Sequence, residues 1–116
     1  MSKKVGAGAL DAAAKAGASE VEKQKVSAPP KSPLHVGNAV LVRTVTFFYS
    51  GRIVLLTPEE IVLEDAAWIA DTGRFATALE KGTLEEVEPY RGPVSISRAA
   101  VVDATTWAHA LPREAK

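Results

Sequence analysis

The segment from Val40 to Ala66 constrains the fold more than any other part of the chain. It is rich in β-branched and aromatic residues, and only Ser50-Gly51 and Thr57-Pro58-Glu59-Glu60 interrupt it. Glycine enters positive φ without a steric cost and proline presets φ at about −65°, so both interruptions are typical of turns. The segment therefore predicts a meander of three antiparallel strands, with its first turn centred on Gly51.

The first strand of this meander is apolar on both faces. Its apolar residues fill both alternating phases: Val40, Val42 and Phe48 in one, and Leu41, Val45, Phe47 and Tyr49 in the other. A sheet that packs on one side only has a polar second face. The pattern predicts that the second face is covered by barrel closure, by a helix or by a neighbouring subunit.

The second half of the chain predicts a short helix and further strands. The third strand starts at Ile61 and can run on through Ile69. Phe75, Ala78 and Leu79 recur at helical spacing within Arg74 to Lys81; Asp71 or Thr72 is the candidate N-cap and Gly82 the C′ residue. Short strands are expected at 84–87, 94–97 and 99–102, with a turn at 90–93 and an irregular tail from Thr105.

Length and composition indicate one domain with an N-terminal arm. Residues 1–33 form an Ala/Lys-rich arm and a Pro-rich linker, and residues 34–116 form the body. The 116-residue chain has no cysteine, and its longest apolar runs are only strand-length. We therefore expect no disulfides, no secretory signal and no membrane association, and a protein made in the cytoplasm.

The charges are segregated along the chain. Up to residue 37 there are six lysines and three acidic residues, whereas from Asn38 onwards six arginines and two lysines face eleven acidic residues. Phosphate neutralisation supplies most of the affinity for nucleic acid, so an acidic body argues against nucleic acid as a partner. The lysine-bearing arm is suited to docking on an acidic neighbour during assembly.

Six residues of the meander carry a resemblance to a known fold: Tyr49, Gly51, Ile53, Leu63, Asp65 and Ala66. Their order, around a Tyr-x-Gly element and an Ile-Val-Leu-Glu-Asp-Ala strand, resembles the Sm-like fold. The resemblance implies a small, strongly bent antiparallel β-barrel of Sm-like or SH3-like type that assembles into a ring. Sm proteins bind RNA bases through an Asp and an Asn before the third strand, where this chain has Thr57-Pro58-Glu59-Glu60. An RNA-binding ring is thus the alternative function.

The body as a whole also resembles small uncharacterised proteins encoded among the structural genes of tailed phages. This resemblance implies a non-enzymatic virion component, such as a capsid or tail accessory protein. We expect the protein to form a homo-oligomer and to contact other structural proteins. The candidate interface residues are Arg43, Phe47, Tyr49, Arg52, Trp68 and Arg74, since arginine and aromatic side chains are enriched in protein interfaces.

Asp71-Thr72-Gly73 is the one motif that suggests catalysis. Asp-Thr-Gly resembles the catalytic motif of retropepsin-like aspartic proteases, in which two carboxylates share a proton across a dimer. Those enzymes continue with a small residue where this chain has Arg74, and a capped loop that opens the helix explains the same three residues. The protease is therefore a third hypothesis.

No other catalytic, metal-binding or cofactor-binding pattern is expected. His35 and His109 are far apart and have no neighbouring histidine or cysteine, whereas a metal needs several converging ligands. The glycines near the N-terminus follow no strand, so they do not form a phosphate-binding loop.

Overall fold

The structure of the protein, a computed structural model, describes residues 31–116, and the predictions for the N-terminal arm up to residue 30 lie outside these residues. The described range holds six strands and one α-helix: β2 (Ala39–Thr44), β3 (Phe48–Leu56), β4 (Glu60–Asp71), α1 (Phe75–Lys81), β5 (Glu86–Pro89), β6 (Val94–Ser97) and β7 (Val101–Thr106), with a 3₁₀ turn η1 (Arg98–Ala100) before β7. The mainly β fold with one short helix is confirmed.

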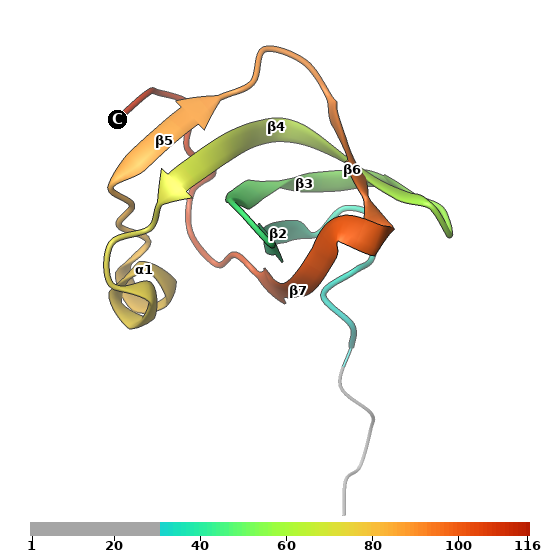
Figure 1. Cartoon of the computed structure of the whole chain (residues 1–116), viewed down its shortest axis with the longest axis horizontal. Helices are drawn as coiled ribbons and strands as arrows, with labels where there is room; N and C mark the ends of the chain where they lie inside the picture. The colour runs from blue at the N-terminus through green and yellow to red at the C-terminus, as the bar shows by residue number, and fades with distance from the viewer. Residues whose placement is uncertain (1–30) are drawn as a thin grey trace, which may run out of the picture. The chain divides into compact units, whose positions relative to one another are not determined.

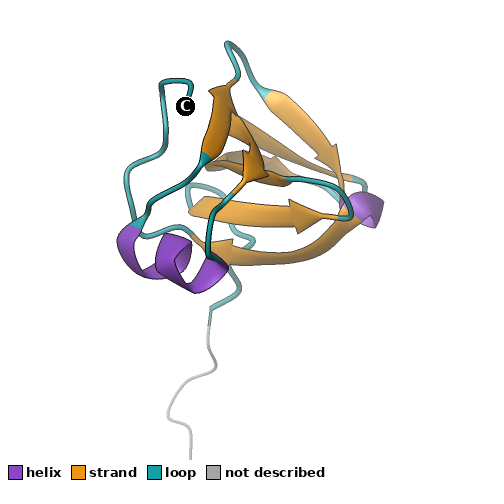
Figure 2. Ribbon diagram, turned by 60° about the vertical axis from the view of Figure 1, so that its left-hand side comes forward, coloured by secondary structure: helices purple, strands orange, loops and turns teal. Residues whose placement is uncertain are grey.

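All six strands belong to one antiparallel sheet (Figures 1 and 2). The strand order is β5-β4-β3-β2-β7, and β6 also pairs with β4. β5 and β6 share one edge of β4, because β6 pairs with residues 60–63 and β5 with residues 67–71. Among the described residues no ladder joins β6 to β7, so strand pairing does not close the sheet and the barrel stays a prediction.

A β-bulge between β3 and β4 bends the sheet. Ser50 pairs with Ala67 and Arg52 pairs with Glu64, so Gly51 faces two residues of β4, Asp65 and Ala66. Asp65 has a φ of 51°, in the left-handed region that aspartate tolerates better than most residues. A bulge sharpens the local bend and twist of a sheet. The bend explains why the outer edge of β4 is divided between β5 and β6.

The predicted first turn at Gly51 is wrong. Gly51 lies inside β3 opposite Val40, and β2 and β3 are connected by Val45, Thr46 and Phe47. The side chain of Thr44 ties this turn: its hydroxyl donates to Phe47 O (2.8 Å) and accepts from Phe47 N–H (3.2 Å). The second turn, at Thr57 to Glu60, is confirmed, with Thr57 Oγ1 accepting the Glu60 N–H at 3.0 Å.

The apolar residues form two clusters, one on each face of β2. The first cluster is built on Val40, Val42, Ile53, Ile61, Leu63, Ala66 and Ile96. The second cluster is built on Leu41, Ala67, Ile69, Ala78, Leu84, Val87 and Trp107. Both faces of β2 are thus buried within one chain, because α1 and the C-terminal tail cover the second face.

The helix ends as predicted but does not begin as predicted. Its N-cap residue is Arg74, with no side-chain capping bond, and the Asp71 carboxylate instead accepts the Gly73 N–H at 2.8 Å. Gly82 is the C-cap with a φ of 76°, and its N–H bonds to Ala78 O. The exposed carboxylate of Asp71 therefore closes a turn before the helix rather than capping it.

Two of the last three predicted strands differ from the observed strands in their bounds. β5 begins at Glu86 rather than residue 84, β6 matches 94–97, and the strand expected at 99–102 is η1 followed by β7. Beyond β7, the tail buries Trp107 and returns to β5, where Lys116 and Val87 exchange main-chain hydrogen bonds of 2.9 and 3.0 Å. We call residues 107–116 the C-terminal strap.

Candidate interaction surfaces

Two of the three arginines predicted for the interface form ion pairs within the chain. Arg43 on β2 forms a forked pair with Asp103 on β7, through its Nε and Nη2. Arg52 on β3 donates to Asp65 Oδ2 at 2.7 Å and to Glu64 Oε1 at 3.3 Å. Both pairs join neighbouring strands, and the second lies at the bulge.

These ion pairs lower the pKa values of the two aspartates. The hydrogen bond from Arg52, helped by the charges of Arg52 and Arg113, lowers the pKa of Asp65 despite some desolvation. The hydrogen bond from Arg43, and then its charge, lowers the pKa of Asp103 in the same way. Both carboxylates are solvent-exposed, so each ion pair on its own contributes little to the stability of the fold.

The structure brings the predicted aromatic residues together. Phe47 packs against Trp68 with ring centroids 4.8 Å apart. Tyr49 is the cross-strand partner of Trp68, and its ring is nearly parallel to that of Tyr90, with a centroid distance of 6.4 Å and an interplanar angle of 20°. Tyr90 was not among the sequence-based candidates, because a tyrosine in a turn carries no periodic signal.

Arg74, the remaining interface candidate, is the N-cap residue of α1, and its side chain is exposed. The next residue, Phe75, is exposed too and approaches Phe48 with a centroid distance of 5.7 Å. Exposed apolar residues that sequence reasoning did not single out as interface candidates include Val45 in the β2–β3 turn and Val102 in β7.

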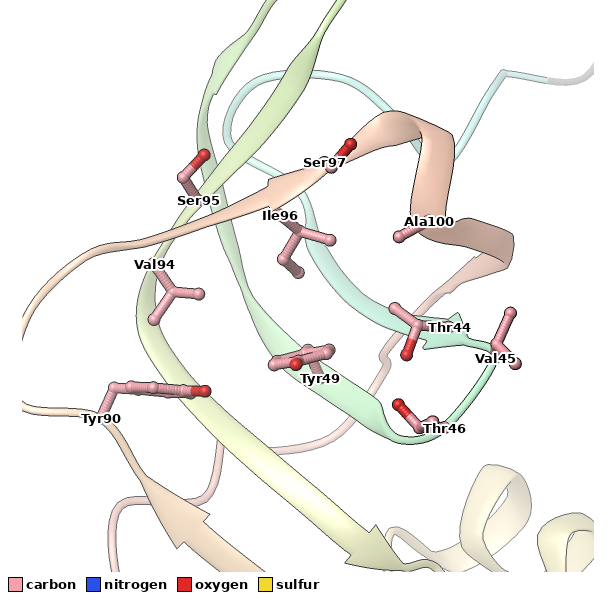
Figure 3. A pocket seen from close by; sticks show the side chains of 10 residues that line it. All are labelled: Thr44, Val45, Thr46, Tyr49, Tyr90, Val94, Ser95, Ile96, Ser97 and Ala100. Atoms are coloured by element: carbon pink, nitrogen blue, oxygen red, sulfur yellow. The ribbon is translucent and has the colours of Figure 1, made fainter.

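A pocket of about 340 Å³ lies between the β2–β3 turn and β6 (Figure 3). Tyr49 and Tyr90 line one side of it, the four residues of β6 line the other, and Thr44 to Thr46 line the end. We call this the tyrosine pocket. Burial, followed by the charge of Tyr49 and hydrogen bonding with it, raises the pKa of Tyr90, so the phenol of Tyr90 is neutral at physiological pH.

β7 has an outer edge that pairs with no strand of residues 31–116. The Trp107 N–H donates to Ala39 O at 2.8 Å, and the β2–β7 register places Thr105 opposite Leu41 and Ala104 opposite Val42. Bonded and non-bonded pairs alternate along an antiparallel ladder. The main-chain groups of Ala104 and Thr106 therefore point away from β2, towards this open edge.

Asp71-Thr72-Gly73 forms a tight turn between β4 and α1. Besides the Asp71 bond to the Gly73 N–H, the buried Thr72 donates its hydroxyl to Gly73 O at 2.8 Å.

Residues 31–116 contain no group of three or more His, Cys, Asp or Glu side chains placed to hold a metal ion. His35 and His109 bond to different main-chain carbonyls, those of Ser32 and Leu79.

In the same range, no helix has the length and apolar character needed to cross a membrane. Comparisons with protein-family models, with curated proteins and with solved structures found no match to this chain.

Proposed function

We propose that this protein is a non-enzymatic structural component that assembles with copies of itself and with other proteins of a large particle. The bent sheet, in which β6 continues through η1 into β7, supports the Sm-like or SH3-like barrel expected from the sequence. Its role is to present interaction surfaces on a small rigid body, with the N-terminal arm docking on neighbouring subunits. The particle we favour is a tailed-phage virion, on the resemblance described above.

The observation that carries this proposal is the open edge of β7. An unpaired row of N–H and C=O groups is a template for a strand from another chain, and proteins usually block such edges with charge, proline or a covering segment. β7 carries one charge, Asp103, and Arg43 neutralises it. Val102 stands on the same strand with 54% of its surface exposed. Pairing along this edge would bury Val102 and satisfy main-chain groups that pair with no strand of residues 31–116.

Because both faces of β2 are buried within the chain, neither face is available to contact another subunit. In the sequence, the apolar second face of this strand was consistent with a subunit interface, but α1 and the C-terminal strap cover it. Self-association is therefore proposed through the edge of β7 rather than through a sheet face.

The test introduces one lysine into the open edge of the full-length protein. We expect the wild-type protein to sediment as an oligomer at micromolar concentration. Val102→Lys should weaken association at least about tenfold, since a lysine on an edge strand opposes pairing. Val36→Lys is the matched control, because Val36 is 62% exposed and lies in a turn outside the strands.

Sedimentation velocity at low and at high salt measures the outcome. A wild-type protein that is monomeric in both conditions would contradict self-association. An oligomer that Val102→Lys and Val36→Lys leave equally intact would show that another surface makes the contact.

A further inference from the structure

The tyrosine pocket has features that self-association through β7 does not use. Its volume of about 340 Å³ falls within the range of small-ligand sites. The residues that line it contribute aromatic rings, aliphatic groups and hydroxyls, and none of them is charged. A ligand with a formal charge would lose its hydration there without gaining a counter-charge, which is unfavourable.

The aromatic side of the pocket offers a flat surface. The rings of Tyr49 and Tyr90 are inclined by only 20° at a centroid distance of 6.4 Å, and Figure 3 shows them side by side below Val94 and Ile96. The face of an aromatic ring carries partial negative charge, so it attracts the slightly positive C–H groups of a ligand. A ligand with a flat C–H face would pack well here.

The opposite side of the pocket supplies directional polar groups. The Arg98 N–H donates to Glu59 O at 2.9 Å, and Ser97 lies opposite Glu60 in the β4–β6 register. By the alternation of an antiparallel ladder, the N–H and C=O of Ser95 and Ser97 point away from β4. β6 pairs with β4 alone among the described strands, so these planar amide groups are open to a ligand.

Together these groups define the chemistry of a ligand. A purely apolar molecule would cover the amide edge of β6 and the phenol hydroxyls without bonding to them, at a cost in free energy. A molecule that is uncharged, presents C–H faces and carries many hydroxyl groups satisfies both sides of the pocket. We infer that the tyrosine pocket is a binding site for a neutral saccharide, with Tyr49 and Tyr90 as the stacking surface and β6 as the hydrogen-bonding edge.

The experiment titrates full-length, ¹⁵N-labelled protein with maltotriose and with triacetylchitotriose, each up to about 20 mM, and follows amide shifts by NMR. At least one of the two should shift the amides of Thr46, Tyr49, Tyr90 and β6 in a saturable way. Trigalacturonate, which carries three carboxylates, should bind more weakly. Tyr90→Ala should weaken binding at least about fivefold through loss of the stacking ring.

Two further variants separate recognition from folding. Phe75→Ala removes another exposed aromatic ring, on α1, and should leave saccharide binding unchanged. Thr46→Val keeps the shape of an exposed turn residue but removes its hydroxyl, and should weaken binding without changing the melting temperature.

The proposal is overturned if neither neutral saccharide shifts these amides, or if Tyr90→Ala and Phe75→Ala behave alike. It is also overturned if the uncharged peptide acetyl-Thr-Val-Thr-Val-Thr-amide shifts the β6 amides while the saccharides do not. That result would assign the pocket to an extended polypeptide.

Discussion

At the scale of single residues, the most instructive position is Gly51. The sequence placed it in a turn because glycine so often supplies positive φ, but no positive φ occurs at this position. A Cβ there would lie 2.9 Å from Leu63 Cβ and 3.3 Å from Ala66 Cα. Glycine is needed because two strands cross closely at the bulge, and that reason depends on residues distant in sequence.

Gly51→Ala should therefore destabilise the protein by about 1–3 kcal/mol, the usual cost of overpacking a core. Gly92→Ala is the matched control, because nothing lies within 4 Å of its added methyl group, and should change stability by less than about 0.5 kcal/mol. Urea unfolding of the two variants beside the wild type measures both values. Equal stabilities would show that the bulge relaxes to admit the methyl group.

Ser50, the neighbour of Gly51, places in the core a hydroxyl that is unpaired within residues 31–116, which lowers the stability of the fold. It is fully buried, and its hydroxyl has no hydrogen-bond partner among the described residues. Ser50→Ala should stabilise the protein by about 1 kcal/mol, because the unpaired hydroxyl is removed at little change in volume. Ser97→Ala, at an exposed serine, should be close to neutral. A destabilised Ser50→Ala protein would point to a hydrogen bond to internal water.

At the scale of elements, α1 is held by the C-terminal strap more than by its own sequence. The helix lacks a side-chain N-cap, but the ring of His109 packs on Gly82 and its Nε2 lies 2.8 Å from Leu79 O. The sequence predicted the helix and its Gly82 end from local signals. It did not predict the strap, because the contacts of Trp107 and His109 follow no periodic pattern.

A double-mutant cycle separates the two restrictions on Gly82. A Cβ there meets His109 Cγ at 2.6 Å, and a φ of 76° already disfavours any side chain. Gly82→Ala should cost more than about 1 kcal/mol in the wild type. It should cost clearly less in a His109→Gly background, where both the Cβ and the ring of His109 are removed and the backbone strain remains. Thermal unfolding of the four proteins gives the coupling. Costs that add without coupling would mean that the strap moves aside freely.

At the scale of the whole molecule, the sequence predicted the strand content better than the way the sheet is bent and covered. Thr57-Pro58 is a local turn signal, so the β3–β4 hairpin and the long β4 were predictable. The bulge at Asp65 and the sharing of β4 between β5 and β6 depend on register, which no local signal carries. The tyrosine pocket escaped prediction for the same reason, since Tyr90 reaches Tyr49 only after the sheet has bent.

Two ion pairs across the sheet give the molecule a weak dependence on pH. The pKa values of Asp65 and Asp103 are lowered in the folded state, so the stabilisation is present above the unfolded value of about 3.9 and is lost as the pH falls through the lowered values. The double variant Asp65→Asn/Asp103→Asn should thus melt slightly below the wild type at neutral pH, and the gap should close under acid conditions.

Melting curves by circular dichroism between neutral and strongly acid pH measure this gap. It should also shrink at high salt, because exposed ion pairs are screened. A gap that persists at acid pH would mean that the aspartates act through shape or through other hydrogen bonds.

The pairing of β2 with β7 has a consequence for the speed of folding. β2 is the first strand of the described sheet and β7 the last, so Val40 meets Thr106 only after the chain between them has been drawn into a loop. The entropy lost in closing a long loop precedes the stabilising contacts that the closed loop makes. This slows folding and favours folding times in the millisecond-to-second range. The local β3–β4 hairpin, held by a short turn, is free to form first. Residues 101–116 then complete both apolar clusters at once, so the closing step and the burial of Trp107 should appear as a single kinetic phase.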